Sequence, residues 1–174
     1  IGYAAARAFA AEGARVVATA RSTAALAPLA EALRAAGLPA PTLLVADLAR
    51  ADAARALAQQ ALDAAAGRID VLVNNAGGSR PMERPDDDAA WDEALLLNFL
   101  SVRRLTERLV PGMADWGWGR VVSVSGAIVA KAVNAATPAK AALESWSKAC
   151  AALYAPRGVT FNCVAPGRID TAQI

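Results

Sequence analysis

The 174-residue sequence predicts an α/β fold in which helices cover both faces of a doubly wound parallel sheet. Helical and strand patterns alternate along the chain, and the predicted strands are short apolar runs with little polar interruption. Strands that are buried on both faces are typical of parallel sheets packed between helices. A chain with 56% hydrophobic and 20% charged residues is large enough for one packed core, so we expect a single domain over residues 1–174.

The first half of the chain predicts three helices and three strands in alternation. Alanine-rich residues 3–12 predict a helix that Gly13 ends, as glycine often does just past a helix. The strands are predicted at 15–20, at 42–46 and in the run that begins at Asp70. Apolar residues at helical spacing mark the two helices between them, with Leu26, Leu29, Ala30 and Leu33 before Gly37, and Leu57, Ala61, Leu62 and Ala65 before Gly67.

The second half continues the alternation after a loop at 78–85 that has no regular period. A long helix is predicted over about 87–110, where Pro111-Gly112 interrupts it. The remaining elements are a strand at 120–124, a helix at about 138–154, and a strand at 159–164 that Pro166-Gly167 ends.

Composition excludes several function classes. The net charge is +2 with scattered basic residues, which predicts neither nucleic-acid binding nor a membrane-surface stripe. No apolar stretch approaches the roughly 20 residues of a membrane-spanning helix, so we expect a soluble, cytoplasmic protein without a membrane partner. Histidine is absent, which removes imidazole bases, Ser-His triads and histidine zinc sites, and no metal site is expected. Cys150 and Cys163 are interpreted as small core residues.

The segment Asn74-Asn75-Ala76-Gly77 follows a buried strand and predicts a ligand site. In open α/β sheets, ligands bind outside the carboxyl ends of the strands, where these residues would lie. A turn that uses asparagine chemistry is the alternative, and Asn-Ala-Gly alone does not exclude it. The chain begins at Ile1-Gly2, already at the head of a helix, so we expect the first strand of the sheet to be missing. That strand is central in the order 3-2-1-4-5-6.

Several short pieces, taken together, resemble the short-chain dehydrogenase/reductase family. They are Ile1-Gly2, Asp47-Leu48, Asn74-Asn75-Ala76-Gly77, Asn98, Lys140, and Pro166-Gly167 with Thr171. Their order and spacing cover nearly the whole chain. The resemblance implies a Rossmann fold that binds a nicotinamide dinucleotide, with the first strand and the C-terminal strand outside this sequence.

The resemblance also implies residues that hold the cofactor. Gly2 is similar to the tail of the family's glycine-rich phosphate loop, and Asp47 with Leu48 to its adenine contact. Asn74, Ala76 and Gly77 are similar to residues that line the adenosine ribose and support the sheet, and Pro166, Gly167, Ile169 and Thr171 to the segment that holds the nicotinamide carboxamide and begins the substrate lid.

Cofactor choice depends on Ala20-Arg21-Ser22, at the end of the strand predicted over 15–20. An acid there would accept hydrogen bonds from the ribose 2′-hydroxyl. Arg21 without a neighbouring acid suits a 2′-phosphate, which favours NADP over NAD, although NAD remains possible. A solvated surface arginine is the alternative.

The catalytic residues implied by the resemblance are incomplete. Asn98 and Lys140 match the family's asparagine and lysine, and Lys140 is expected to bind the cofactor as well. The proton-donating tyrosine four residues before the lysine is replaced by Ala136. Thr137 is a poor substitute, because its hydroxyl is far less acidic and points about 100° away around a helix. Three positions compete for the family's serine. Ser125 is our choice because it lies at the carboxyl end of a strand, and Ser123 and Gly126 are the alternatives.

We therefore expect an oxidoreductase that transfers a hydride between NADP(H) and a small-molecule carbonyl or alcohol. The alternative is a catalytically silent dinucleotide-binding or interaction protein on the same scaffold, because alanine cannot donate a proton. The resemblance further implies a homodimer or homotetramer formed through the helices at 87–110 and 138–154.

Overall fold

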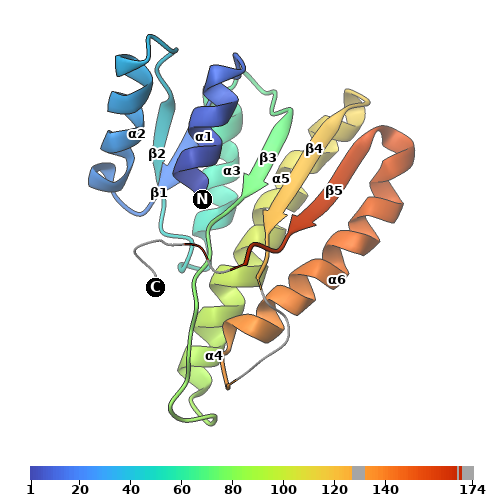
Figure 1. Ribbon diagram of the computed structural model, residues 1–174. Helices are drawn as coiled ribbons and strands as arrows, with labels where there is room; N and C mark the ends of the chain where they lie inside the picture. Colours follow the sequence, from blue (N-terminus) through green and yellow to red (C-terminus); the bar gives the residue numbers. More distant parts are fainter. Residues whose placement is uncertain (127–131, 168, 170–174) are drawn as a thin grey trace.

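The computed structural model describes residues 1–126, 132–167 and 169 (Figure 1). Within these residues, five strands form two parallel sheets. One sheet pairs β1 (Val17–Ala20) with β2 (Thr42–Val45). The other has the order β3-β4-β5, with β3 at Val71–Asn74, β4 at Gly119–Val124 and β5 at Val159–Val164. The parallel pairing confirms the predicted α/β fold with a doubly wound parallel sheet.

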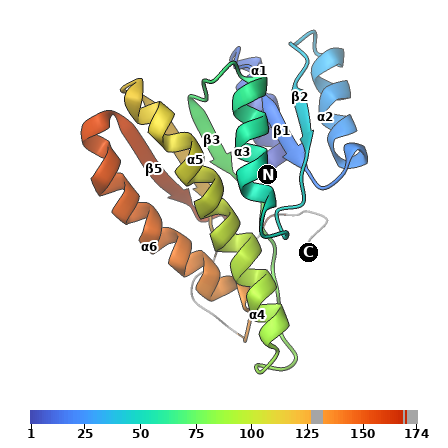
Figure 2. The same ribbon diagram turned by 180° about the vertical axis from the view of Figure 1, so that it is seen from behind.

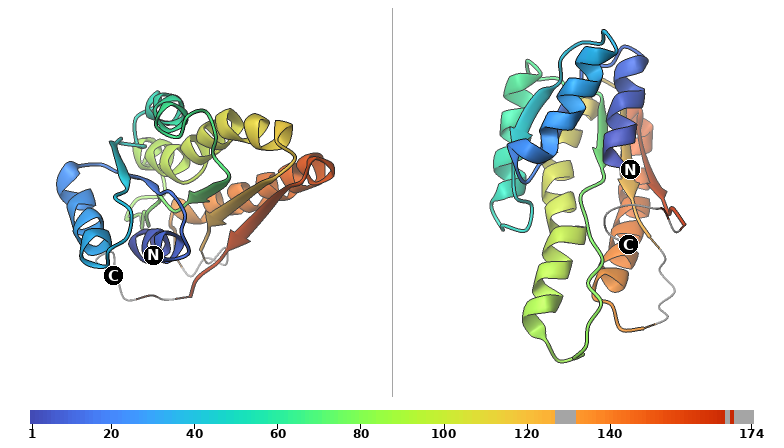
Figure 3. Two further views of the ribbon diagram at one scale, coloured as in Figure 1. Left: turned by 90° about the horizontal axis from the view of Figure 1, so that it is seen from above. Right: turned by 60° about the vertical axis from the view of Figure 1, so that its left-hand side comes forward.

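Helices cover both faces of these strands. Figures 2 and 3 show α3, α5 and α6 on one face, and α1 and α2 on the other. The helical elements are α1 (Gly2–Ala11), α2 (Thr23–Ala35), α3 (Ala53–Ala64), α4 (Asp88–Leu95), the π-helical turn η1 (Leu96–Leu100), α5 (Ser101–Asp115), α6 (Ala136–Tyr154) and the 3₁₀ turn η2 (Ala155–Arg157). No helix in the described part of the chain is both long and apolar enough to cross a membrane.

The two sheets share no ladder hydrogen bonds in the described residues, and the break falls between β1 and β3. This is the place of the central first strand in the order 3-2-1-4-5-6, in agreement with the sequence prediction. Apolar side chains nevertheless connect the two sheets. One core cluster contains Leu57 of α3 and Leu105 of α5, and both Leu44 of β2 and Leu72 of β3 pack against it.

The prediction that Pro111-Gly112 interrupts the long helix is wrong, because α5 continues to Asp115. Proline removes one backbone donor and leaves the carbonyl four residues earlier without its helical partner. That carbonyl belongs to Glu107, which is exposed to water like Pro111 itself. The opposite face of α5 stays packed through Val110 and Met113, so the helix is held in place from the buried side.

The start of α6 also differs slightly from the prediction. The helix begins at Ala136, two residues before the predicted start, and includes Pro138 as its third residue. Proline is tolerated in the first turn, because an amide there would have no partner within the helix. The earlier start places Ala136 and Thr137 on the first turn of α6.

Candidate functional site

The carboxyl ends of β3 and β4 meet the beginning of α6 and the π-helical turn η1. Lys140 of α6 donates a hydrogen bond from Nζ to the carbonyl oxygen of Val124, the last residue of β4, at 2.7 Å. Gly77, just after β3, lies so close that an added Cβ would be 2.9 Å from Lys140 Nζ and 2.8 Å from Asn98 Oδ1. The structure therefore brings together Gly77, Asn98 and Lys140, three residues that the sequence singled out.

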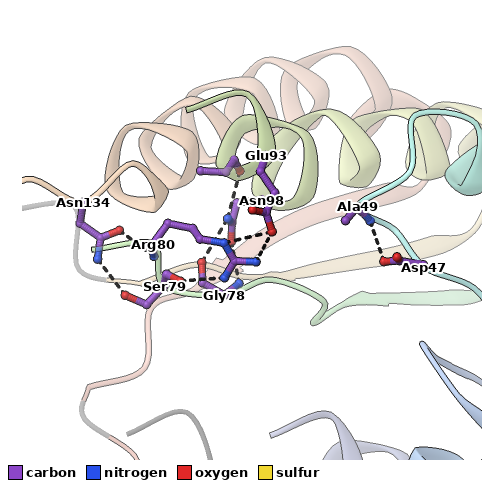
Figure 4. Close-up of polar contacts among 9 residues, drawn as sticks. Asp47, Ala49, Gly78, Ser79, Arg80, Glu93, Asn98 and Asn134 are labelled. Atoms are coloured by element: carbon purple, nitrogen blue, oxygen red, sulfur yellow. Dashed lines mark hydrogen bonds and ion pairs between the residues drawn. The ribbon is translucent and has the colours of Figure 1, made fainter. Parts of the chain in front are cut away.

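Asn98 is fully buried within η1 and uses both ends of its amide. Its Nδ2 donates to the carbonyl oxygens of Ala94 at 3.0 Å and Gly78 at 3.2 Å. Its Oδ1 accepts from the backbone amide of Gly78 at 3.0 Å (Figure 4). Because buried polar groups are costly unless they are paired, these bonds fix the chain that follows Gly77. Single π turns inside α-helices often occur at functional sites.

Lys140 is partly buried, and burial lowers the pKa of its ammonium group, while the negative charge of a Cys163 thiolate would act to raise it. No carboxylate of the described residues forms an ion pair with Lys140. Glu144, one turn further along α6, accepts a hydrogen bond from Ser125 Oγ at 2.5 Å. The lysine is therefore a desolvated cation whose only hydrogen bond to the described residues is to the Val124 carbonyl.

The three candidate serine positions have different surroundings. Ser123 is fully buried, and its Oγ accepts from Asn74 Nδ2 at 3.3 Å, which fits a strand residue with an inward hydroxyl. Ser125 lies just after β4 and turns its hydroxyl toward Glu144. Gly126 carries no side chain, and an added Cβ there would meet no described atom within 4 Å.

The segment Asn74-Asn75-Ala76-Gly77, called the NNAG segment below, contributes side chains to the protein interior as well as to the carboxyl end of β3. The Asn74 side chain is buried and donates to Thr106 Oγ1 at 3.1 Å as well as to Ser123, so it supports the sheet against α5. Ala76 packs against the core cluster that contains Leu57. The other end of this amide, Asn74 Oδ1, is buried and accepts no hydrogen bond from the described residues. Gly77 follows at the carboxyl end of the same strand.

The residues implied for the adenosine end follow β1 and β2. Arg21 is exposed directly after β1 and forms no hydrogen bond or ion pair with the described residues. Asp47 Oδ1 accepts from the backbone amide of Ala49 at 3.1 Å (Figure 4). Leu48 is buried beside it, and its carbonyl accepts from Ser101 Oγ at 2.7 Å. These bonds fix the turn after β2 and leave the Arg21 guanidinium available.

The remaining residues predicted to bind the cofactor lie at the start of α1 and after β5. Gly2 begins α1, and an added Cβ there would lie 2.6 Å from Asn75 Nδ2, so the start of α1 touches the NNAG segment. Pro166, Gly167 and Ile169 follow β5, with the Ile169 side chain exposed. Thr171 lies outside the described residues.

Asn134 is a structural link that the sequence reasoning missed. Its Oδ1 accepts from the backbone amides of Arg80 at 3.1 Å and Ala136 at 3.0 Å, and its Nδ2 donates to Ser79 Oγ at 2.8 Å (Figure 4). Asn134 therefore ties the loop after β3 to the first turn of α6. An asparagine just before a helix is a common capping signal, which could have drawn attention to it.

Comparisons with known proteins identify the family of this chain. The family profile described as short chain dehydrogenase matches residues 1–173. Nodulation protein G of Azospirillum brasilense is 38% identical over 117 residues, which cover 65% of this chain and 48% of that protein. An uncharacterized oxidoreductase of Mycobacterium tuberculosis is 37% identical over 181 aligned residues, covering 100% of this chain and 67% of that protein.

The fold of this chain is also similar to solved structures of short-chain oxidoreductases. The crystal structure of a metagenomic short-chain oxidoreductase in complex with NADP superimposes with a TM-score of 0.84 at 34% identity, covering 97% of this chain and 77% of that one. The chain spans about half the length of the Azospirillum relative. With the profile matched along nearly the whole sequence, this chain belongs to the short-chain dehydrogenase family.

Proposed function

We propose that this chain is the cofactor-binding part of an oxidoreductase that transfers a hydride between NADP(H) and a carbonyl or alcohol substrate. The observation that carries the proposal is the convergence of Gly77, Asn98 and Lys140 at the carboxyl ends of β3 and β4. Ligands of open α/β sheets bind at this edge. Family membership supports the reaction class, and a structural neighbour that contains NADP supports the cofactor.

The residues present fit a nicotinamide dinucleotide. An added Cβ at Gly77 would come within 3.0 Å of Asn98 Oδ1, which is held by its hydrogen bonds to Gly78, so this position favours glycine, and one at Gly2 would displace the Asn75 side chain. The amino end of α1, at Gly2, suits a pyrophosphate, because backbone amides there point outward and favour negative charge. Arg21 would hold the 2′-phosphate, and Asp47 with Leu48 the adenine. Ala76 and Gly77 would line the ribose, and Pro166, Gly167 and Ile169 the nicotinamide carboxamide.

When bound, the nicotinamide ring donates or accepts the hydride. The protein's part is to position the reactants and to stabilise the negative charge that develops on the substrate oxygen. Lys140 supplies a positive charge at the strand tips, where partial exclusion of water strengthens its electrostatic effect. Asn98 holds the Gly78 backbone, which keeps Gly77 against Lys140. Glu144 accepts a hydrogen bond from Ser125 and forms no ion pair with Lys140 among the described residues.

Turnover of the complete gene product tests the proposed reaction. We expect NADPH absorbance to fall in the presence of at least one member of a panel of ketones and aldehydes. A silent dinucleotide-binding protein is the second candidate, because the buried Ala136 has no hydroxyl. Tight NADPH binding without consumption on any substrate, unchanged by Ala136→Tyr, would support the silent protein instead.

Cofactor choice has its own test. Arg21→Glu should weaken NADPH binding by about 10- to 100-fold in calorimetry, because a charged hydrogen bond contributes about 1.5–3 kcal/mol and the new carboxylate repels the 2′-phosphate. NADH binding should weaken much less. Arg15→Glu is the matched control, since Arg15 is exposed near the opposite end of the same strand. Equal effects of the two substitutions would contradict the assignment of Arg21.

Self-association is proposed from the same family resemblance, through α4, α5 and α6. Light scattering of the complete protein should give the mass of a dimer or a tetramer, and a lone monomer would contradict the proposal.

A further inference from the structure

Reduction of a carbonyl group requires a proton as well as a hydride. The donor must lie within hydrogen-bond distance of the substrate oxygen, or reach it through one water molecule. The polar groups at the ends of β3 and β4 can therefore be examined one by one for a group that is able to release a proton there. Ala136 at the start of α6 has no such group.

Most polar side chains at these strand tips are already committed to partners within the protein. The hydroxyl of Ser123 lies in the interior beside Asn74. The hydroxyl of Ser125 donates its proton to Glu144 of α6 in a hydrogen bond of 2.5 Å. Asn98 uses its amide to hold Gly78, and an amide group does not release a proton near neutral pH. None of these groups serves as a proton source for a ligand.

Lys140 is different, because its bonding is incomplete. An ammonium group has three N–H donors, and only one of them is used by the described residues, on the Val124 carbonyl. The short distance from Nζ to the space beside Gly77 places the remaining donors at the strand tips. Among the described residues, Glu144 accepts a hydrogen bond from Ser125 and forms no ion pair with Lys140, and Asn98 is a neutral amide.

We propose that Lys140 is itself the proton donor to the substrate oxygen, directly or through one water molecule. In the reductive direction, the carbonyl carbon receives a hydride from NADPH and the π electrons move to the oxygen. An O–H bond then forms at that oxygen while an N–H bond of Lys140 breaks, and the electron pair of that bond stays on the neutral amine. The amine recovers its proton from solvent. This inference rests on the proposed reductase function.

The charged and titratable groups around Lys140 are consistent with this role. Burial lowers the pKa of the lysine, which makes it a stronger acid than an exposed lysine. From β5, Cys163 opposes this shift when its thiol is ionised. From α6, Glu144 is engaged by Ser125. The strand tip of β3 contributes Gly77, and η1 contributes the neutral Asn98, so neither element adds a charge.

Two substitutions separate proton donation from simple charge. Lys140→Arg keeps the positive charge but cannot release a proton near neutral pH, so we expect kcat to fall by about 10²-fold or more. The kcat of Lys140→Ala should fall by a similar factor. Added ethylamine should then raise the rate of this variant in proportion to the ethylamine concentration. Lys148→Arg, an exposed lysine on the same helix, is the matched control and should retain full activity. Thermal unfolding of each variant checks its folding.

A third measurement does not depend on turnover. Reductive methylation of the free protein across pH, read by peptide mass spectrometry, should give a lower titration midpoint for Lys140 than for Lys148. Equal midpoints for the two lysines would contradict the proposal. If Lys140→Ala does not fold, the methylation midpoints and the kcat of Lys140→Arg together test whether Lys140 donates the proton.

The outcomes distinguish this inference from the proposed function. If the unmodified protein reduces carbonyls but Lys140→Arg is equally fast, the proton comes from another group and only the inference is overturned. A loss in Lys140→Ala that ethylamine does not relieve overturns it as well. If the unmodified protein consumes no NADPH on any substrate, the proposed reductase function fails and the inference fails with it.

Discussion

Gly77 is the position at which a single methyl group should disturb the proposed site most directly. The Cβ of Gly77→Ala would lie 2.8 Å from Asn98 Oδ1 and 2.9 Å from Lys140 Nζ, both well below ordinary contact distance. Neither neighbour can retreat freely, because Asn98 is bonded to Gly78 and Lys140 to Val124. Overpacking of this kind costs about 1–3 kcal/mol. At roughly 2–4 °C per kcal/mol for a chain of this size, Tm should fall by about 2–12 °C.

Thermal unfolding and NADPH calorimetry of the complete protein measure the two consequences. We expect NADPH affinity to fall by about tenfold or more, which corresponds to roughly 1.4 kcal/mol, because Lys140 must shift. Gly112→Ala is the control, since its Cβ meets nothing within 4 Å and alanine is favoured over glycine inside a helix such as α5. If Gly77→Ala melts and binds like the parent protein, the close approach of these three residues is not the organising feature of the site.

Three further predictions concern the stability of the folded protein. Gly158→Ala should destabilise the protein by at least about 2 kcal/mol, as a fall in Tm, because Gly158 has a φ of 74° and its Cβ would lie only 1.9 Å from the Gly117 carbonyl oxygen. Ser101→Ala should cost about 1–3 kcal/mol in urea unfolding, because it leaves the Leu48 carbonyl without its 2.7 Å hydrogen bond. Burial lowers the pKa of Lys140, so the unfolded chain binds more protons between the folded pKa and the ordinary lysine value, and stability should rise with pH across that window. Lys140→Met should abolish this rise in urea titrations at alkaline pH.

The strands were predictable because their sequence pattern and their surroundings have one physical cause. A strand covered by helices on both faces must be apolar throughout, and the predicted run at 159–164 coincides with β5. The long helix at 87–115 was less predictable. Its π turn at 96–100 and its continuation past Pro111 depend on packing of the buried face, and local sequence does not encode that packing.

The site was predictable only in part for a similar reason. Asn98 and Lys140 stood out through their place in a family pattern, and the structure brings both to Gly77. Ser101 and Asn134 did not stand out, because each bonds a partner more than fifty residues away in the sequence. Side-chain pairs of this kind form only once separate elements have packed together, so neither residue carries a local signal for the partner it contacts.

The proposed ligand would contact strands on both sides of the place between β1 and β3 that the first strand of the family fold takes. Side chains of α3 and α5 form one cluster against which Leu44 of β2 and Leu72 of β3 both pack. Figure 2 shows α3 and α5 on one face of the strands. Arg21 and Asp47 follow strands of one sheet, whereas Gly77 follows a strand of the other. A dinucleotide held by all three would therefore bridge both sheets at their carboxyl ends. Because a ligand that binds only the folded state stabilises it by RT ln(1 + [L]/Kd), about 2.7 kcal/mol at a hundredfold excess over Kd, NADPH should raise the free energy of unfolding of the complete protein by this amount, and Arg21→Glu should reduce the gain.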